Sequence, residues 1–349
     1  MEKKYTTIII ILLIVIVGLS GFIIYDKCSG KAVENSSNNE VSEEDNSSSE
    51  VHALSGRFAF KDNNVIYSAD YSDFLENGIK EVIADDADRL ANMVMFNYNL
   101  YYIDNIGKLV VYNPYKKSSI EYTFEGVKIH ANTVILPGKD YTIISDCSNF
   151  IRIDMKEKKY KKLDITSRNY KMKYDDDSKL LYYISGQEVV AYDVVKEKSI
   201  KVIANNMGPE FIVDDELYLF NFQNNVLLGV YNKTTGEINN LDFSSYGAQV
   251  FTPTIVGKIN GNLYFLSGEH TLFKYSNNSI SSILNSGFLR TIVVGSNIFI
   301  EDSEVVCSDV CWAGNNANYY VYSTLEDKLL DVNYAYIGSL FEFRNVFYY

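Results

Sequence analysis

The sequence predicts an all-β fold, a single β-propeller of four-stranded blades. The composition and an internal repeat carry this prediction. The chain of 349 residues holds 29 Tyr and 19 Phe but only 4 Pro, and aromatic side chains favour the pleated surface of a sheet. A unit of three short strands recurs seven times along the chain, as is typical of radially repeated sheets.

The clearest copy of the repeat is residues 179–204, KLLYYISGQEVVAYDVVKEKSIKVIA. Segments 180–184, 188–194 and 199–203 are rich in β-branched and aromatic side chains, and short turns at 185–186 and 196–198 separate them. Three strands cannot cover both of their own faces. This unit therefore needs neighbours of the same kind.

The seven copies begin 35 to 46 residues apart, at Arg57, Asn99, Asp140, Lys179, Glu216, Asn262 and Asn297. This spacing matches the period of a propeller blade. One more short apolar segment precedes most copies, at residues 93–96, 134–136, 211–213, 254–256 and 291–294. We expect each of these segments to be the inner strand of its blade.

The first copy has no such segment before it, so we expect the end of the chain to supply its inner strand. Residues 339–343, SLFEF, are the predicted closing strand, which would remove the open edge of the first sheet. Residues 345–349, NVFYY, then have no place in a seven-bladed ring. Seven blades are favoured, with six or eight as alternatives.

The copies share a rhythm, NLYYxD followed by xLxxY and Asp or Asn, at residues 99–113, 180–193 and 262–275. With this rhythm, residues 56–349 resemble the lipoprotein-receptor-like (YWTD/TolB-like) propellers of membrane-anchored bacterial proteins, a family of unknown function. The YWTD tetrapeptide itself is absent. The resemblance implies a fold and a binding role, and it implies no catalytic residue.

The N-terminal part predicts a membrane anchor. Residues 1–5 would be cytoplasmic, residues 6–25 a transmembrane signal anchor of about 30 Å, and residues 26–55 a disordered acidic tether rich in Ser, Asn and Glu. Lys3 and Lys4 before the span place the propeller, residues 56–349, outside the cell membrane. The alternatives are a cleaved signal peptide and lipidation of Cys28.

The net charge of −13 argues against nucleic acid as a partner, because phosphate would be repelled. The three histidines, His52, His130 and His270, are scattered, and no HExxH or CxxC motif is present. The sequence therefore predicts no transition-metal site and no cofactor.

Acidic clusters lie at residues 85–88, 175–177 and 214–215. Oxygen ligands converging from several blades could hold Ca²⁺, and a pair of carboxylates could serve a glycosidase. The favoured interpretation is aspartates that stabilise turns, for which Asp is well suited.

An insert at residues 303–318, SEVVCSDVCWAGNNAN, interrupts the seventh copy. We predict a disulfide between Cys307 and Cys311, and a ligand contact at Trp312, the only Trp of the chain. Residues four apart in a strand are about 13 Å apart, beyond the roughly 7 Å limit for a disulfide, so residues 308–310 must turn. The alternative is a neutral loop extension.

These features predict a non-enzymatic binding or assembly module of the cell envelope, whose ligand would be a protein, a peptide or a glycan. Loops on a rigid repeated frame form a platform for such ligands. One alternative is an extracellular glycan-active hydrolase or lyase. A second is a sensor that works through a membrane partner.

Overall fold

The computed structural model describes residues 56–125, 129, 133–146, 149–165, 167, 171–224, 227–244, 254–267, 271–277, 279–285, 288–307, 311–331, 338 and 344–348. The chain divides into two compact units, one of His52–Glu304 with Ala313–Tyr349 and one of Met1–Val51 with Val305–Trp312. The predicted span 6–25 and tether 26–55 lie outside the described residues. Within the described part, no helix is long and apolar enough to cross a membrane.

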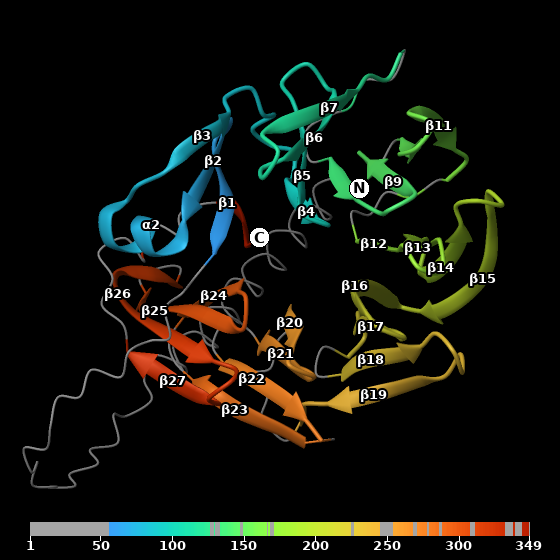
Figure 1. Cartoon of the computed structure of the whole chain (residues 1–349). Coiled ribbons are helices and arrows are strands. Elements are labelled where there is room, and N and C mark those ends of the chain that lie inside the picture. The colour runs from blue at the N-terminus through green and yellow to red at the C-terminus, as the bar shows by residue number, and fades with distance from the viewer. Residues whose placement is uncertain are drawn as a thin grey trace, which may run out of the picture. The chain divides into compact units, whose positions relative to one another are not determined.

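The larger unit contains seven four-stranded sheets. In chain order, the sheets follow one another around a common centre (Figure 1), and neighbouring first strands contact each other between several successive sheets. Six sheets use four strands that are consecutive in sequence, and one sheet adds the last strand to the first three. The fold is a seven-bladed β-propeller.

The blades are numbered here from the one that contains Arg57. Blades one to four consist of β1 (Arg57–Asp62), β2 (Val65–Asp70), α2 (Tyr71–Asn77), β3 (Glu81–Ala84), β4 (Val94–Phe96), β5 (Asn99–Ile103), β6 (Leu109–Asn113), β7 (Ser118–Tyr122), β8 (Val134–Leu136), β9 (Tyr141–Ser145), β10 (Phe150–Asp154), β11 (Lys159–Leu163), β12 (Met172–Asp175), β13 (Leu180–Ser185), β14 (Glu188–Asp193) and β15 (Lys198–Asn205).

Blades five to seven, and the strand that completes blade one, consist of β16 (Met207–Val213), β17 (Glu216–Asn221), β18 (Leu227–Asn232), β19 (Ile238–Asp242), β20 (Thr254–Ile259), β21 (Asn262–Ser267), β22 (Thr271–Ser276), β23 (Ser279–Asn285), β24 (Phe288–Val294), β25 (Asn297–Cys307), β26 (Cys311–Ser323), β27 (Lys328–Asp331) and β28 (Arg344–Tyr348). The seven predicted copies and their four-stranded blades are confirmed.

The C-terminal strand closes the ring, as predicted, but the segment that does so differs from the prediction. β28 pairs antiparallel with β1, with Phe58 opposite Tyr348 and Ala59 opposite Phe347. The closing strand is therefore residues 344–348, the segment for which the prediction had no place. The predicted closing segment, residues 339–343, lies outside the described residues.

A short helix, α2, interrupts the first blade, and the prediction of three uninterrupted strands missed it. The Asp70 carboxylate accepts from the Ser72 amide at 3.1 Å and from the Asp73 amide at 3.4 Å, and Gly78 ends the helix at a φ of 69°. An N-terminal Asp and a left-handed Gly are the usual boundaries of a helix. Phe74 and Leu75 lie on the buried side of α2.

Two other elements differ from the prediction. The inner strand of blade four, β12, was not predicted, because residues 172–175 are only partly apolar. The insert 303–318 is not a loop through most of its length, since Ser303–Cys307 continues β25 and Cys311–Asn318 continues β26.

A polar residue at the end of the third strand builds the turn to the fourth strand in blades two to five. Its side-chain oxygen accepts hydrogen bonds from main-chain amides two or three residues later, at 2.7 to 3.0 Å, in turns that begin at Asn113, Asp154, Asp193 and Asn232. The fourth residue after it has a positive φ in each turn, at Lys117, Lys158, Glu197 and Gly236. This turn explains why the repeat rhythm ends in Asp or Asn.

The hydrophobic core lies between neighbouring blades. Phe58 and Phe60 of blade one pack with Val294 and Phe299 of blade seven. Each of the seven buried clusters combines side chains of adjacent blades in the same way. Strand side chains alternate between two faces, so every blade covers one neighbour on each side.

Candidate functional site

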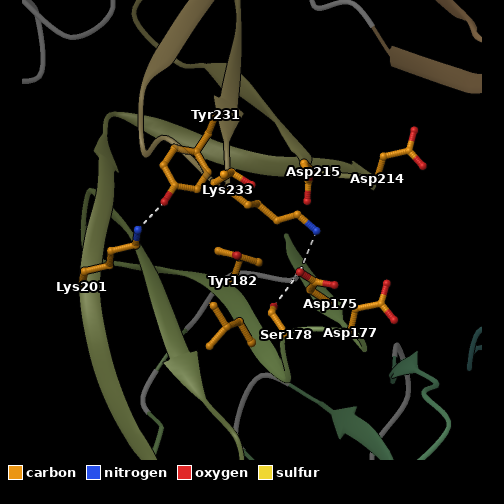
Figure 2. A pocket seen from close by; sticks show the side chains of 11 residues that line it. Asp175, Asp177, Ser178, Tyr182, Lys201, Asp214, Asp215, Tyr231 and Lys233 are labelled. Atoms are coloured by element: carbon orange, nitrogen blue, oxygen red, sulfur yellow. Dashed lines mark hydrogen bonds and ion pairs between the residues drawn. The ribbon is translucent and has the colours of Figure 1, made fainter.

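A pocket of about 510 Å³ opens between blades four and five (Figure 2). It is built from the ends of strands and from the turns that join the first strand to the second and the third to the fourth. Its lining residues are Asp175, Asp177, Ser178, Leu180, Tyr182, Lys201, Asp214, Asp215, Tyr231, Lys233 and Thr234.

Lys233 of blade five bridges the two blades. Its ammonium lies 2.8 Å from the Asp175 carboxylate of blade four; the Asp175 side chain is buried, with 5% of its surface exposed, and the Lys233 side chain is partly buried, with 14% exposed. The main-chain amide of Lys233 donates to the Asp215 carbonyl at 2.8 Å. Lys233 therefore holds the 214–215 turn of its own blade and balances the charge of a buried carboxylate in the neighbouring blade.

The Asp175 carboxyl is held in its ionised form. Burial raises its pKa, but hydrogen bonds from Lys233 and from the Ser178 hydroxyl, at 2.6 Å, outweigh burial and bring the pKa below its usual range. At neutral pH, Asp175 is a carboxylate whose oxygens accept from these donors. It is not suited to donate a proton.

Two tyrosines form the aromatic part of the lining. Tyr182 is almost fully buried, and burial, followed by the nearby Asp175 charge, raises the pKa of its hydroxyl. The Lys201 ammonium donates a hydrogen bond to the Tyr231 hydroxyl and lies 5.1 Å from the centroid of its ring. Both lysines of the pocket thus pair with groups that attract cations, a carboxylate and an aromatic ring.

The other carboxylates leave the mouth of the pocket negative. Asp214 pairs with Lys258 at 3.0 Å. Asp177 and Asp215 are exposed, and neither forms an ion pair with any residue in the described ranges. The lining holds four aspartates and two lysines, a formal excess of two negative charges.

The structure brings together two of the three predicted acidic clusters, residues 175–177 and 214–215. The third cluster is separate and acts in a turn, since the Asp88 carboxylate accepts from the Leu90 and Ala91 amides at 2.8 and 2.9 Å. No group of three or more His, Cys, Asp or Glu side chains could hold a metal ion among the residues that the structure describes.

The lysines and tyrosines of the pocket were not predicted from the sequence. Lys233 is 58 residues from Asp175 in the sequence, and nothing in its local surroundings marks it. Tyr182 and Tyr231 occupy repeat positions that other blades also fill with tyrosine, such as Tyr101 and Tyr112 of blade two, so nothing in the repeat singles them out. Of the pocket residues, only the aspartates of the Asp-rich turns could be recognised as candidates from the sequence.

The predicted site residues Cys307, Cys311 and Trp312 belong to the other compact unit, Met1–Val51 with Val305–Trp312. Cys307 ends β25 and Cys311 begins β26, and the connecting residues 308–310 lie outside the described residues. The disulfide and the role of Trp312 stay predictions. The three histidines, with Cys28 and Cys147, also lie outside the described residues.

No family model matches the sequence, and no curated protein matches it. Among solved structures, the C-terminal WD40 domain of Sif2 matches with a TM-score of 0.53 and 11% identity, over 78% of this chain and 79% of that chain. The computationally designed protein Ika8 matches with a TM-score of 0.52 and 10% identity, over 79% of this chain and 86% of that chain.

PorZ, a bacterial surface component of the type-IX secretion system of Porphyromonas gingivalis, matches with a TM-score of 0.44 and 13% identity, over 72% of this chain. The chain spans 38% of the length of PorZ. At these identities the likeness concerns the fold alone. The resemblance to the YWTD/TolB-like family is not confirmed and stays a prediction.

Proposed function

We propose that this propeller is a non-enzymatic binding module of the cell envelope, and that the pocket between blades four and five receives a positively charged group of a protein or peptide. The observation that carries this proposal is the excess of carboxylates at the pocket, with Asp177 and Asp215 exposed at its mouth. The lining already holds two ammonium groups of the chain itself. A ligand ammonium or guanidinium would meet the same chemistry.

The pocket is preorganised for such a ligand. The two-residue turn at residues 214–215 is closed by the pairing of Val213 with Glu216, and the main-chain amide of Lys233 ties it to the turn between the third and fourth strands of the same blade. Carboxylates on such short, tied turns lose little conformational freedom when a cation binds, which favours affinity.

The enzymatic alternative has less support. A glycan-active hydrolase needs one carboxylic acid whose pKa is raised, so that it can protonate the leaving group. The pKa of Asp175 is lowered, and its oxygens are engaged by Lys233 and Ser178. This environment suits a fixed charge for recognition.

The cellular setting of the proposal rests on the sequence. The apolar span 6–25 and the polar tether 26–55 would hold the propeller outside the membrane, at a distance set by the tether. A sensor that works through a membrane partner is the alternative, and a binding module needs no such partner.

The pocket is tested by titrating the purified full-length chain, in detergent micelles, with a fluorescent tetralysine peptide that is acetylated and amidated at its ends. We expect binding that weakens about tenfold when Asp177→Asn and Asp215→Asn are combined, because two charge-assisted contacts are lost. A tetraglutamate peptide should not bind.

The matched control combines Glu76→Gln with Glu157→Gln, which removes two exposed carboxylates from other blades. Unchanged binding of tetralysine by this control would assign the effect to the pocket. Equal losses in both double variants would show a general effect of net charge, and would contradict the proposed site.

A further inference from the structure

A tyrosine occupies a turn position in blade two where glycine is favoured. Asn97 and Tyr98 form the two-residue turn between β4 and β5, closed by the pairing of Phe96 with Asn99. Their φ angles are 47° and 58°. Such a turn needs left-handed backbone at both positions, and a bulky side chain is disfavoured there.

Blade six has the favoured residues at the same place. Its corresponding turn is Asn260–Gly261, with φ angles of 50° and 79°, closed by the pairing of Ile259 with Asn262. The fold therefore accommodates Asn–Gly at this turn. Tyr98 is also 65% exposed, so burial of its ring does not compensate for its backbone.

A second exposed tyrosine lies beside the first. Tyr115, in the turn after the third strand of blade two, is 62% exposed, and its ring centroid lies 6.0 Å from that of Tyr98. The two rings meet at 72°. Together they form a corner with one aromatic wall on each side.

Hydrogen bonds tie the two turns together. The side-chain amide nitrogen of Asn113 donates to the side-chain oxygen of Asn99 at 2.9 Å, and the side-chain amide nitrogen of Asn99 donates to the main-chain carbonyl of Asn97 at 2.9 Å. Asn113 also accepts from the main-chain amide of Lys116 at 2.8 Å. These bonds hold in place the two turns that carry the tyrosine corner, Tyr98 with Tyr115, before any ligand arrives.

We infer that the tyrosine corner binds a pyranose ring of a glycan. A pyranose has an apolar C–H face, which would lie on one ring, and a hydroxyl rim, which would meet the tyrosine hydroxyls and the exposed Lys116, the residue after Tyr115. Residues with strained backbone cluster at functional sites, and neither burial nor glycine's freedom accounts for Tyr98. This site lies on blade two and does not depend on the pocket of blades four and five.

Size and charge favour a sugar over larger ligands. Two tyrosines offer at most about 500 Å² of surface, whereas a protein partner needs about 800 Å² on each side. The chain carries a net charge of −13, which repels the phosphates of a nucleic acid. A single pyranose ring is small enough for two tyrosines to cover, and it carries no charge that the chain would repel.

The test uses the full-length chain in detergent micelles with cellohexaose and chitohexaose, whose rings have all-equatorial substituents and free C–H faces. We expect saturation transfer in NMR to be strongest at the axial ring protons. The Kd should rise about tenfold or more for Tyr98→Gly and for Tyr115→Ala. Absence of binding to both sugars would overturn the inference.

Tyr98→Gly also separates a binding role from a structural one, because Gly is suited to the left-handed turn. We expect its thermal midpoint to equal or exceed that of the original chain while sugar binding is lost. A lower midpoint would show that Tyr98 serves the fold, and would overturn the inference. The control is Leu325→Ala, which is 73% exposed, lies at the position of blade seven that matches Tyr115, and should bind sugar normally.

Discussion

At the scale of single residues, the ion pair of Asp175 with Lys233 joins blades four and five at the pocket. The two charges are 2.8 Å apart and nearly excluded from solvent. A buried pair of this kind contributes little compared with two apolar residues, but removing one partner leaves an uncompensated charge. The pair therefore makes the interface of blades four and five sensitive to substitution.

We expect Lys233→Met to lower the free energy of unfolding by about 3 kcal/mol at pH 7. The pKa of Asp175 is lowered in the original chain, so the stability from its ionised form is present above about pH 4 and is lost as the pH falls through the folded value. Without the ammonium, burial should raise this pKa, and protonation should relieve the variant. Denaturant unfolding at pH 7 and pH 4 should show a deficit that shrinks in acid.

The control for this prediction is the double variant Asp175→Asn with Lys233→Met, which removes both charges. It should regain part of the stability that Lys233→Met loses, since no buried charge remains. A deficit of the same size at both pH values, with no recovery in the double variant, would mean that lost packing of the lysine stem is responsible.

At the scale of the element, the turn between the third and fourth strands is the unit that the repeat preserves. In blade four, the Asp193 carboxylate accepts from the Val195 and Lys196 amides at 2.9 and 2.8 Å. Burial raises the pKa of Asp193, but these hydrogen bonds and Lys196 outweigh it and lower the pKa overall. Blades two and five use Asn at the same place.

We expect Asp193→Ala to lower the free energy of unfolding by about 1 kcal/mol, because two main-chain amides lose their acceptor. Asp193→Asn should stay close to the original stability, since an amide oxygen accepts the same bonds. Urea unfolding of both variants measures this difference. If both variants lost equal stability, the ion pair of Asp193 with Lys196, at 3.0 Å, would matter more than the turn.

At the scale of the whole propeller, closure depends on one strand from the end of the chain. β28 completes the sheet of β1, β2 and β3, so the pairing joins residues at opposite ends of the described chain. Without β28, the backbone groups of β1 on that side would have no partner strand. An exposed strand edge is a site for association with other chains.

A chain that ends at Phe343 should therefore unfold at a lower temperature, with a broader transition, and should form oligomers in size-exclusion chromatography. A chain that lacks only Tyr349, which lies beyond β28, is the control and should behave like the original. A truncated chain that stays monomeric with an unchanged midpoint would contradict closure by β28.

The sequence by itself determined the repeat, the number of strands in each blade and the turns that join them. These features are local. The alternation of side chains along residues 180–193 sets the strands, and the Asp that ends β14 sets the following turn. Both depend only on residues close together in the sequence, so they can be recognised from the sequence alone. The boundary residues of α2, Asp70 and Gly78, are local signals too. The helix was missed because this segment was interpreted as part of the strand repeat.

The tertiary structure alone decided which strand closes the ring and which residues share the pocket. Both 339–343 and 345–349 have strand-like side chains, and only the pairing of β28 with β1 selects between them. The pairing of Asp175 with Lys233 likewise joins two blades across 58 residues. Such contacts arise because neighbouring blades bring distant segments together. A local pattern of side chains does not predict which distant segments will meet.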